Sequence, residues 1–369
     1  MKRNDALDAL RGLFLVVMTL NHAGGPLRRL THEPFGFVSA AEGFFLLSGL
    51  ATGLAYTAPS FSSIAQRTFH NARRIYLYHL LSFLFVFALV RLFPLAAAES
   101  RWTDRLLIIR EEPLSALLLG AATLYRPHFF DILPMYTLLV LAVPFLIRRY
   151  QNGSGAAVLL FSLSLWGFSQ TGLKEIFAAP SLPLTQSELG YFDLFAWQFP
   201  FVLGTWLGFT GRKGSTPRLF YHPCFIPIAL TIGLFLFLVR HQPVSLDAVF
   251  PFSIQHATEK SHLGWLRLIN VLLITYLTAR LVQAYPHLFR WRWFAFLGAH
   301  SLPVFTYHVL MLYLLEFFVR KPIASYGTGP ALLLSMLFIL SLTLPAWVHS
   351  RYKERKTKTQ NQPALTLST

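Results

Sequence analysis

The chain has 369 residues, of which 54% are hydrophobic and only 13% charged, whereas roughly 25% of the residues of a soluble globular protein are charged. This composition excludes a soluble enzyme, a secreted domain and a disordered chain, and it indicates an integral membrane protein. The net charge is +16, but the basic residues lie mostly between apolar runs, which favours orientation in a membrane and contact with anionic lipids over nucleic-acid binding. The single cysteine, Cys224, excludes a disulfide framework, and no metal-ligand spacing is present.

Apolar runs bounded by Arg, Lys, Pro and Gly predict an all-α, polytopic membrane protein with about ten transmembrane helices. The first run is interrupted at once by Asn21 and His22, so we interpret it as a spanning helix and not as a cleavable signal peptide. The predicted spans are 8–26, 36–57, 75–93, 131–147, 156–173, 194–210, 224–239, 264–283, 294–318 and 330–348.

The loops between these spans predict the topology. More Lys and Arg fall in the loops on one side, which places both termini in the cytoplasm. We therefore expect a single transmembrane domain over residues 1–349 and a polar, disordered cytoplasmic tail over residues 350–369. The segment 105–124 has Arg110, Glu111 and Glu112 near its centre, and charges at mid-membrane are costly, so we expect it on the surface or as a re-entrant piece.

The first predicted helix carries three polar residues on one stripe. At 100° per residue, Asp8, Arg11 and His22 share a face, and His22 lies roughly 16 Å deeper than Arg11. A titratable imidazole at that depth is a hypothesis of function. The alternative is structural, with Asp8 and Arg11 paired at the helix end and His22 bonded to a backbone carbonyl.

The second predicted helix places Glu42, Gly49, Gly53 and Tyr56 on one face. The two glycines predict a close helix contact of the small-xxx-small kind. Glu42 is an acid inside an apolar run, near the same membrane side as His22, so we expect Glu42 to orient the imidazole as the acid of a triad does. The alternative is that Glu42 is protonated or paired with a base such as Lys260 or Arg267.

Three further groups of residues follow from the predicted topology. On the outer side we expect a set that binds a polar acceptor, with an aromatic face for a sugar ring: Asp131, Trp197, Gln198, Lys260 and Arg267. On the inner side we expect an arginine set that holds phosphates or, alternatively, only orients the chain and binds lipid headgroups: Arg67, Arg73, Arg74, Arg290 and Arg292. In the ninth predicted span, His300, Ser301 and His308 sit among apolar residues, and the first two either cap a helix or contact substrate.

The order of these motifs resembles the OpgC family of osmoregulated periplasmic glucan succinyltransferases, within the type 3 transmembrane acyltransferases. The resemblance rests on RNDALDALRG at 3–12, the Arg11-to-His22 spacing, EGFFLLSG at 42–49 and further short motifs along the chain. These are DILPMY at 131–136, Trp197-Gln198 to Gly208, Lys260 to Arg267, and GAHSLPVF at 298–305.

The resemblance implies a multi-pass O-acyltransferase of the bacterial inner membrane. It would move an acyl group, most simply succinyl, from cytoplasmic succinyl-CoA or acetyl-CoA to hydroxyls of a periplasmic glucan, with acyl-CoA, the glucan and membrane lipids as partners and no permanently bound cofactor. His22 would be the base or a transient acyl carrier and Arg11 its companion, with Asp8, Asn21, His300 and Ser301 near substrate. Asn21 is also a candidate oxyanion donor.

A rival hypothesis is a proton-coupled transporter or flippase for a polar lipid or glycan, in which His22 and Glu42 form a proton relay. A non-catalytic scaffold would leave the stripe of Asp8, Arg11 and His22 without a role. The absence of a visible internal repeat counts against the transporter.

Overall fold

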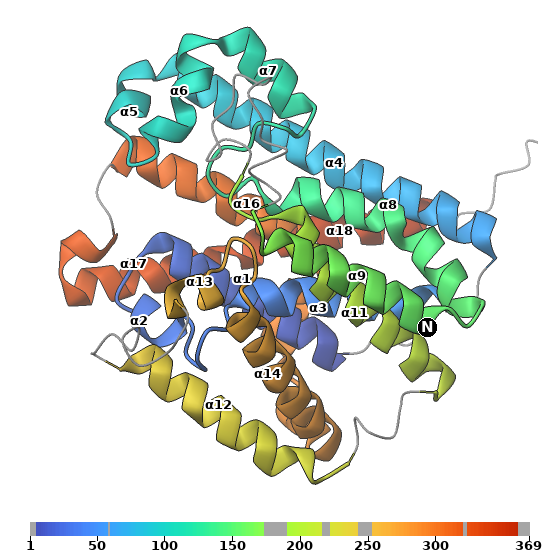
Figure 1. Cartoon of the computed structure of the whole chain (residues 1–369). Coiled ribbons are helices and arrows are strands. Elements are labelled where there is room, and N and C mark those ends of the chain that lie inside the picture. Colours follow the sequence, from blue (N-terminus) through green and yellow to red (C-terminus); the bar gives the residue numbers. More distant parts are fainter. Residues whose placement is uncertain are drawn as a thin grey trace, which may run out of the picture.

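The structure, a computed structural model, describes residues 5–57, 60–172, 190–215, 222–242, 253–319 and 323–360, and within these ranges the chain is helical with no strand. The helices are arranged as in Figure 1. In the first half they are α1 (Asp5–Ala23), α2 (Arg28–Thr31), α3 (Ala40–Tyr56), α4 (Phe61–Leu92), α5 (Pro94–Glu99), α6 (Thr103–Glu111), α7 (Pro113–Ala121), α8 (Ile132–Gln151) and α9 (Gly155–Ser169). In the second half they are α11 (Leu194–Lys213), α12 (Phe225–His241), α13 (Ile254–Thr258), α14 (Trp265–Ala284), η2 (Pro286–Phe289), α15 (Arg292–Ala299), α16 (Ser301–Leu314), η3 (Leu315–Val319), η4 (Ile323–Tyr326), α17 (Thr328–Ser341) and α18 (Thr343–Gln360).

Each predicted span coincides with a helix or a pair of consecutive helices. In the described part of the chain, six helical runs are long and apolar enough to cross a membrane: Asp5–Ala23, Phe61–Leu92, Ile132–Gln151, Trp265–Ala284, Ser301–Val319 and Thr328–Lys358. The helices α3, α9 and α12 are apolar but shorter. The all-helical membrane fold is therefore confirmed, while the number of ten spans and the cytoplasmic termini stay predictions.

Two predicted segments differ in detail from the structure. The predicted span 294–318 is broken at His300, where α15 ends and α16 begins. The expected disorder from Ser350 onward was wrong for residues 350–360, because α18 continues to Gln360. That stretch holds no Gly or Pro to stop the helix, and Arg351 and Glu354 pair one turn apart. Residues 361–369 of the expected tail lie outside the described residues.

The segment 105–124 folds into α6 and α7, which are nine residues each. Nine residues of helix extend only about 14 Å, too short to cross a bilayer. The two helices meet at Glu112 and Pro113, and together with α5 they form a cap on α4 at the top of Figure 1. This arrangement agrees with the expected surface or re-entrant position.

Glycines bring two helix pairs into backbone contact. A Cβ on Gly49 or Gly53 of α3 would lie 2.1 Å from the carbonyl oxygen of Phe201 or Thr205 of α11. The contact is reciprocal, because a Cβ on Gly204 or Gly208 of α11 would lie 2.1 Å from a carbonyl oxygen of α3: Leu46 or Leu50. The predicted small-xxx-small contact is thus confirmed, and its partner is α11.

A second seam of the same kind joins α1 to α15. A Cβ on Gly12 would lie 1.9 Å from the carbonyl oxygen of Phe294, and one on Gly298 would lie 1.9 Å from that of Asp8. The N-terminal half of α1 is therefore fixed against α15, and this contact helps to set the direction of the whole helix.

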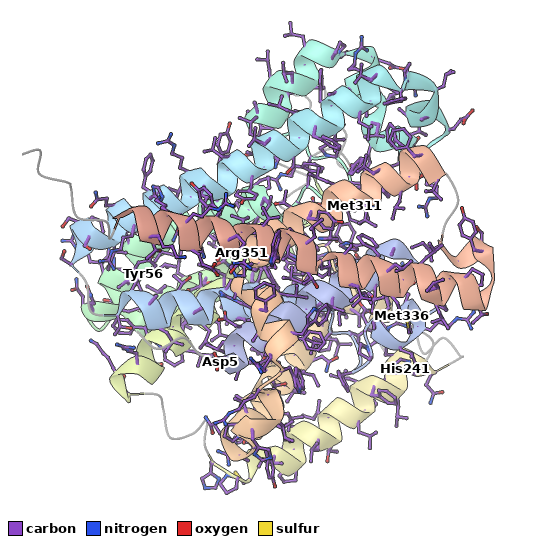
Figure 2. All side chains as sticks on the ribbon, turned by 180° about the vertical axis from the view of Figure 1, so that it is seen from behind. Asp5, Tyr56, His241, Met311, Met336 and Arg351 are labelled. Carbon is purple, nitrogen blue, oxygen red and sulfur yellow. The ribbon has the colours of Figure 1, made fainter. Side chains whose placement is uncertain are left out.

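The two ends of the helical bundle are distinct. In Figure 2, Asp5, Tyr56 and Arg351 lie in one half of the molecule, and Met311, Met336 and His241 lie in the other. The start of α1 and the charged part of α18 thus share one end, which we name the terminal end. His22, at the far end of α1, belongs to the opposite end.

Candidate active site

His22 occupies the last turn of α1. The helix stops there because Gly24 adopts a left-handed conformation with φ of 71°, and Pro26 follows two residues later. The His22 ring stacks on Phe129 with ring centroids 4.3 Å apart. Its Nδ1 atom lies 3.1 Å from Nε2 of His308 on α16, so a hydrogen bond between two histidines fixes the imidazole.

The sequence analysis did not predict that His308 is the partner of His22. The signal was present, since a histidine inside an apolar run is the same criterion that singled out His22. His308 is buried, and the carbonyl of Phe305, one turn earlier, interacts with its ring. Nδ1 of His308 is buried without a hydrogen-bond partner in the described part of the chain. In the tautomer in which Nε2 of His308 is the acceptor, Nδ1–H of His22 donates the hydrogen bond between the two rings.

The second ring nitrogen of His22 is then a lone-pair acceptor. Within the described residues Nε2 of His22 has no hydrogen-bond partner, and it is not among the fully buried unpaired atoms. In this tautomer the arrangement orients a nitrogen that has a free lone pair, which is what a general base requires.

Asn21 has a structural role next to this histidine. Its side-chain oxygen accepts a 2.7 Å hydrogen bond from the Thr31 hydroxyl, and its amide group donates to the Thr31 carbonyl. The side chain thus holds the short helix α2 against the end of α1, and its amide is already used.

The expected contact between Glu42 and His22 was wrong, and the alternative pairing with a base holds. Glu42 is 0% exposed, and its Oε1 accepts a 2.9 Å hydrogen bond from Arg267. Its Oε2 accepts bonds from the backbone and the side chain of Ser39. Glu42 is the third residue of α3 and completes a capping box with Ser39, so helix capping decides where this carboxylate points.

Arg267 ties four parts of the chain together. Its two terminal nitrogens bind Glu42 at 2.9 Å and Glu33 at 2.7 Å, and its Nε donates to the Thr258 carbonyl at 2.8 Å. Glu33 also pairs with Arg240 of α12 at 2.9 Å. Burial alone would raise the pKa of Glu33, but Arg267, His32 and Arg240 together outweigh burial and hold that pKa below its usual value.

Lys260 lies beside this network, on the loop before α14. Its carbonyl accepts a 3.0 Å hydrogen bond from Nε1 of Trp197, and its ammonium lies 5.8 Å from the centre of the Phe192 ring. Burial lowers the pKa of Lys260, and the Glu42 carboxylate opposes that shift. The ammonium is also close enough to His22 to act on it electrostatically.

The other residues expected on the outer side are used within the fold. Trp197 is 0% exposed, so its ring offers no face to a sugar. Gln198 is bonded to Ser162 of α9 at 2.5 Å, and Asp131 accepts a bond from the backbone of Tyr191. The expected aromatic face was wrong for Trp197, because its indole N–H is required to hold the Lys260 loop.

A different aromatic cluster lies beside His22. The rings of Trp102 and His128 stack with centroids 5.4 Å apart, and Phe129 packs edge-on against both. All three are partly exposed. Burial, assisted by Arg105 and Arg101, lowers the pKa of His128 to about 4, so the ring is neutral at pH 7.

Backbone strain also gathers at this end of the molecule. The described non-glycine residues with positive φ are Thr123 and three residues with roles at the site: Glu33, Phe129 and Leu263. Glu33 binds Arg267 and Phe129 stacks on His22, while Leu263 follows Lys260 in the same loop. Such conformations cost about 1–3 kcal/mol each and concentrate at functional sites.

Arg11 and Asp8 lie toward the terminal end and are not brought to His22. They are paired at 4.0 Å, and Arg11 also donates to the carbonyl of Leu47. The expected phosphate set divides into two groups: Arg67, Arg73 and Arg74 lie on α4, while Arg290 and Arg292 flank the start of α15. These helices pack mainly on α8 and α1 respectively.

The break between α15 and α16 places a second histidine pair near the terminal end. Nδ1 of His300 lies 2.8 Å from Nδ1 of His349 on α18, and Arg74 acts electrostatically on His349. His300 is the N-cap residue of α16, as the capping alternative expects, although its side chain makes no capping hydrogen bond.

The fold and the site together define a helical protein with six helical runs long and apolar enough to cross a membrane in its described part. A bonded histidine pair, a lysine and a partly exposed aromatic cluster lie at one end of it. Over residues 3–354 the chain matches the family model described as OpgC protein, and it belongs to the OpgC family. Membership indicates a membrane acyltransferase that modifies glucan. Neither the comparison with curated proteins nor the comparison with solved structures gave a match.

Proposed function

We propose that this protein transfers a succinyl group from cytoplasmic succinyl-CoA to a hydroxyl of a periplasmic glucan in the bacterial inner membrane, with His22 as the general base. The observation that carries the proposal is the hydrogen bond of 3.1 Å between His22 Nδ1 and His308 Nε2. With His22 as the donor of this bond, the ring is fixed and its Nε2 carries the lone pair that would act as the base. Positioned bases of this kind contribute about 10²–10⁴-fold to a rate.

The chemical step needs one proton carrier. Nε2 of His22 takes the proton of the sugar hydroxyl while the hydroxyl oxygen attacks the thioester carbonyl. The new C–O bond forms, the C–S bond breaks, and the proton passes from Nε2 to the departing CoA thiolate. The hydrogen bond from Nδ1 to His308 strengthens as His22 becomes an imidazolium, which stabilises the transition state more than the ground state.

We propose that Lys260 selects the succinyl donor by pairing with its terminal carboxylate. Arg267 and Arg11 also carry positive charge, but Arg267 is already paired with two carboxylates and Arg11 with Asp8. Arg11 also lies roughly 16 Å from His22 along α1. The Lys260 ammonium has no hydrogen-bond partner in the described part of the chain and lies near His22.

The phosphates of CoA would bind toward the terminal end. Supporting features are the basic residues there, including Arg74 beside the His300–His349 pair and Arg290 and Arg292 at the start of α15. Guanidinium groups suit phosphates because they donate two parallel hydrogen bonds.

The test is release of free CoA thiol by purified protein in nanodiscs. Succinyl-CoA and acetyl-CoA are compared with and without a linear or cyclic β-glucan, using wild type, His22→Ala and Lys260→Gln. We expect glucan-dependent release with wild type, its loss in His22→Ala, and a shift of preference toward acetyl-CoA in Lys260→Gln. Lys353→Gln on the exposed part of α18 is the matched control for charge.

Other outcomes refute defined parts of the proposal. Full activity of His22→Ala would remove the base, and unchanged donor preference in Lys260→Gln would remove the carboxylate contact. An acyl group trapped on His22 would replace direct transfer by a two-step route. Glucan uptake into vesicles without thioester consumption would favour the transporter.

A further inference from the structure

Trp102, His128 and Phe129, which we name the aromatic wall, stand next to the proposed base. Phe129 links the wall to His22. The centre of its ring lies 4.3 Å from that of His22 and 4.2 Å from that of His128. Trp102 extends the wall beyond His128, at 5.4 Å. The three rings come from two loop segments, the turn before α6 and the loop before α8, that are far apart in sequence.

The wall is held by the helix that carries His308. Tyr313 of α16 donates a 3.0 Å hydrogen bond to the His128 carbonyl and packs edge-on against Trp102. Glu316, in the π-helical turn η3, accepts hydrogen bonds from the backbone and guanidinium of Arg101. The helix α16 and the turn η3 that follows it therefore position both parts of the site. His308 holds His22, while Tyr313 and Glu316 hold the aromatic wall.

The wall has accessible polar edges. In the described part of the chain, neither Nε1 of Trp102 nor a ring nitrogen of His128 has a hydrogen-bond partner. None of these atoms is among the fully buried unpaired ones. Flat apolar faces combined with unused N–H and lone-pair groups match a pyranose, which has an apolar C–H face and a rim of hydroxyls.

We propose that the aromatic wall is the acceptor subsite, in which Trp102 and His128 bind one sugar ring of the glucan and present a hydroxyl of it to Nε2 of His22. This inference rests on the proposed function and names the residues that recognise its acceptor. Trp102 and His128 contact the sugar, while Glu316 is a positioning residue that acts through the turn bearing Trp102.

The experiment measures the acceptor and donor sides separately. For Trp102→Ala and His128→Ala we expect the KM for a linear β-glucan oligosaccharide to rise about 3- to 10-fold, the effect of losing an aromatic contact. The KM for succinyl-CoA should stay as in wild type. Trp102→Phe should retain much of the affinity because it keeps the ring. Trp347→Ala, a tryptophan on α18 that is 51% exposed, is the control.

A direct binding measurement keeps this test independent of catalysis. Calorimetric titration of the same oligosaccharide into wild type and Trp102→Ala in nanodiscs should show weaker binding by the variant. Glu316→Gln should raise the KM for glucan and leave that for succinyl-CoA unchanged. Equal glucan affinity in wild type and both alanine variants would overturn the subsite while leaving the transfer reaction in place. Glucan binding that depends on Trp102 without any CoA release would instead overturn the proposed function and keep the subsite.

Discussion

Replacement of Arg267 by Met tests whether the buried charge network stabilises the end of the bundle opposite the terminal end. Arg267 is 4% exposed and binds two carboxylates and one carbonyl. Methionine fills similar space but leaves Glu42 and Glu33 without that partner. Loss of one partner from a buried ion pair typically costs about 3–5 kcal/mol.

The structure places the expected cost at the lower end of this range. Glu33 keeps its bond to Arg240, and Glu42 keeps its bonds to Ser39. We therefore expect Arg267→Met to lower the free energy of unfolding by about 3 kcal/mol, which is about a hundredfold in the equilibrium constant. The double variant Arg267→Met/Glu42→Gln should recover part of the lost stability, because the amide that replaces the Glu42 carboxylate is uncharged.

The assay is denaturant unfolding in mixed micelles, followed by tryptophan fluorescence. Arg149→Met, an exposed arginine at the end of α8, is the control and should change stability by less than about 0.5 kcal/mol. A loss for Arg267→Met below about 1 kcal/mol, or no recovery in the double variant, would show that the carboxylates are protonated or hydrated and that the reasoning is wrong.

His308→Ala should lower kcat about 10²-fold with little change in the KM for succinyl-CoA, because His22 loses the acceptor that orients it; unchanged kcat would contradict this. Wild type should lose stability as the pH falls below about 4.5, the usual pKa of glutamate, since the folded-state pKa of Glu33 lies lower and its pairing is fully present only above that pH. Unfolding titrations should show a smaller decline for Glu33→Gln, and an equal decline would refute the assignment. Gly53→Ala should destabilise the fold by about 1–3 kcal/mol in the same titration, because the added methyl group meets the Thr205 carbonyl; wild-type stability would contradict the seam.

The fold class was predictable because a helix that spans a membrane requires a long apolar run of residues. Long apolar runs identify helices with little ambiguity, and each predicted span is helical in the structure. The Gly49 and Gly53 contact followed from spacing alone, since small residues four apart form a flat strip. Gly298 and Pro303 flank the break at His300, and both residue types favour helix ends. The predicted span nevertheless continued through them, because most of the surrounding residues are apolar.

Single site residues were predictable from the sequence, but the residues that they contact were not. His22 stood out by depth, but its partner lies 286 residues away on α16, and periodicity does not show which helices are neighbours. Glu42 was assigned to His22 because both lie near the same end, whereas local capping by Ser39 and the longer reach of Arg267 decide its contacts. The aromatic wall lies on loops, where helical periodicity gives no guidance.

The seam between α3 and α11 restricts how this protein can change over evolutionary time. At Gly43 and Gly120 an added methyl group would meet a phenylalanine side chain, Phe14 or Phe83 respectively. A smaller residue in place of that phenylalanine can restore the fit. At Gly49, Gly53 and their partners on α11 the obstacle is a main-chain carbonyl, which every amino acid carries. No substitution elsewhere can remove this carbonyl. If one of these glycines is replaced by a larger residue, the close contact is regained only when the glycine is restored, and otherwise the two helices must move apart.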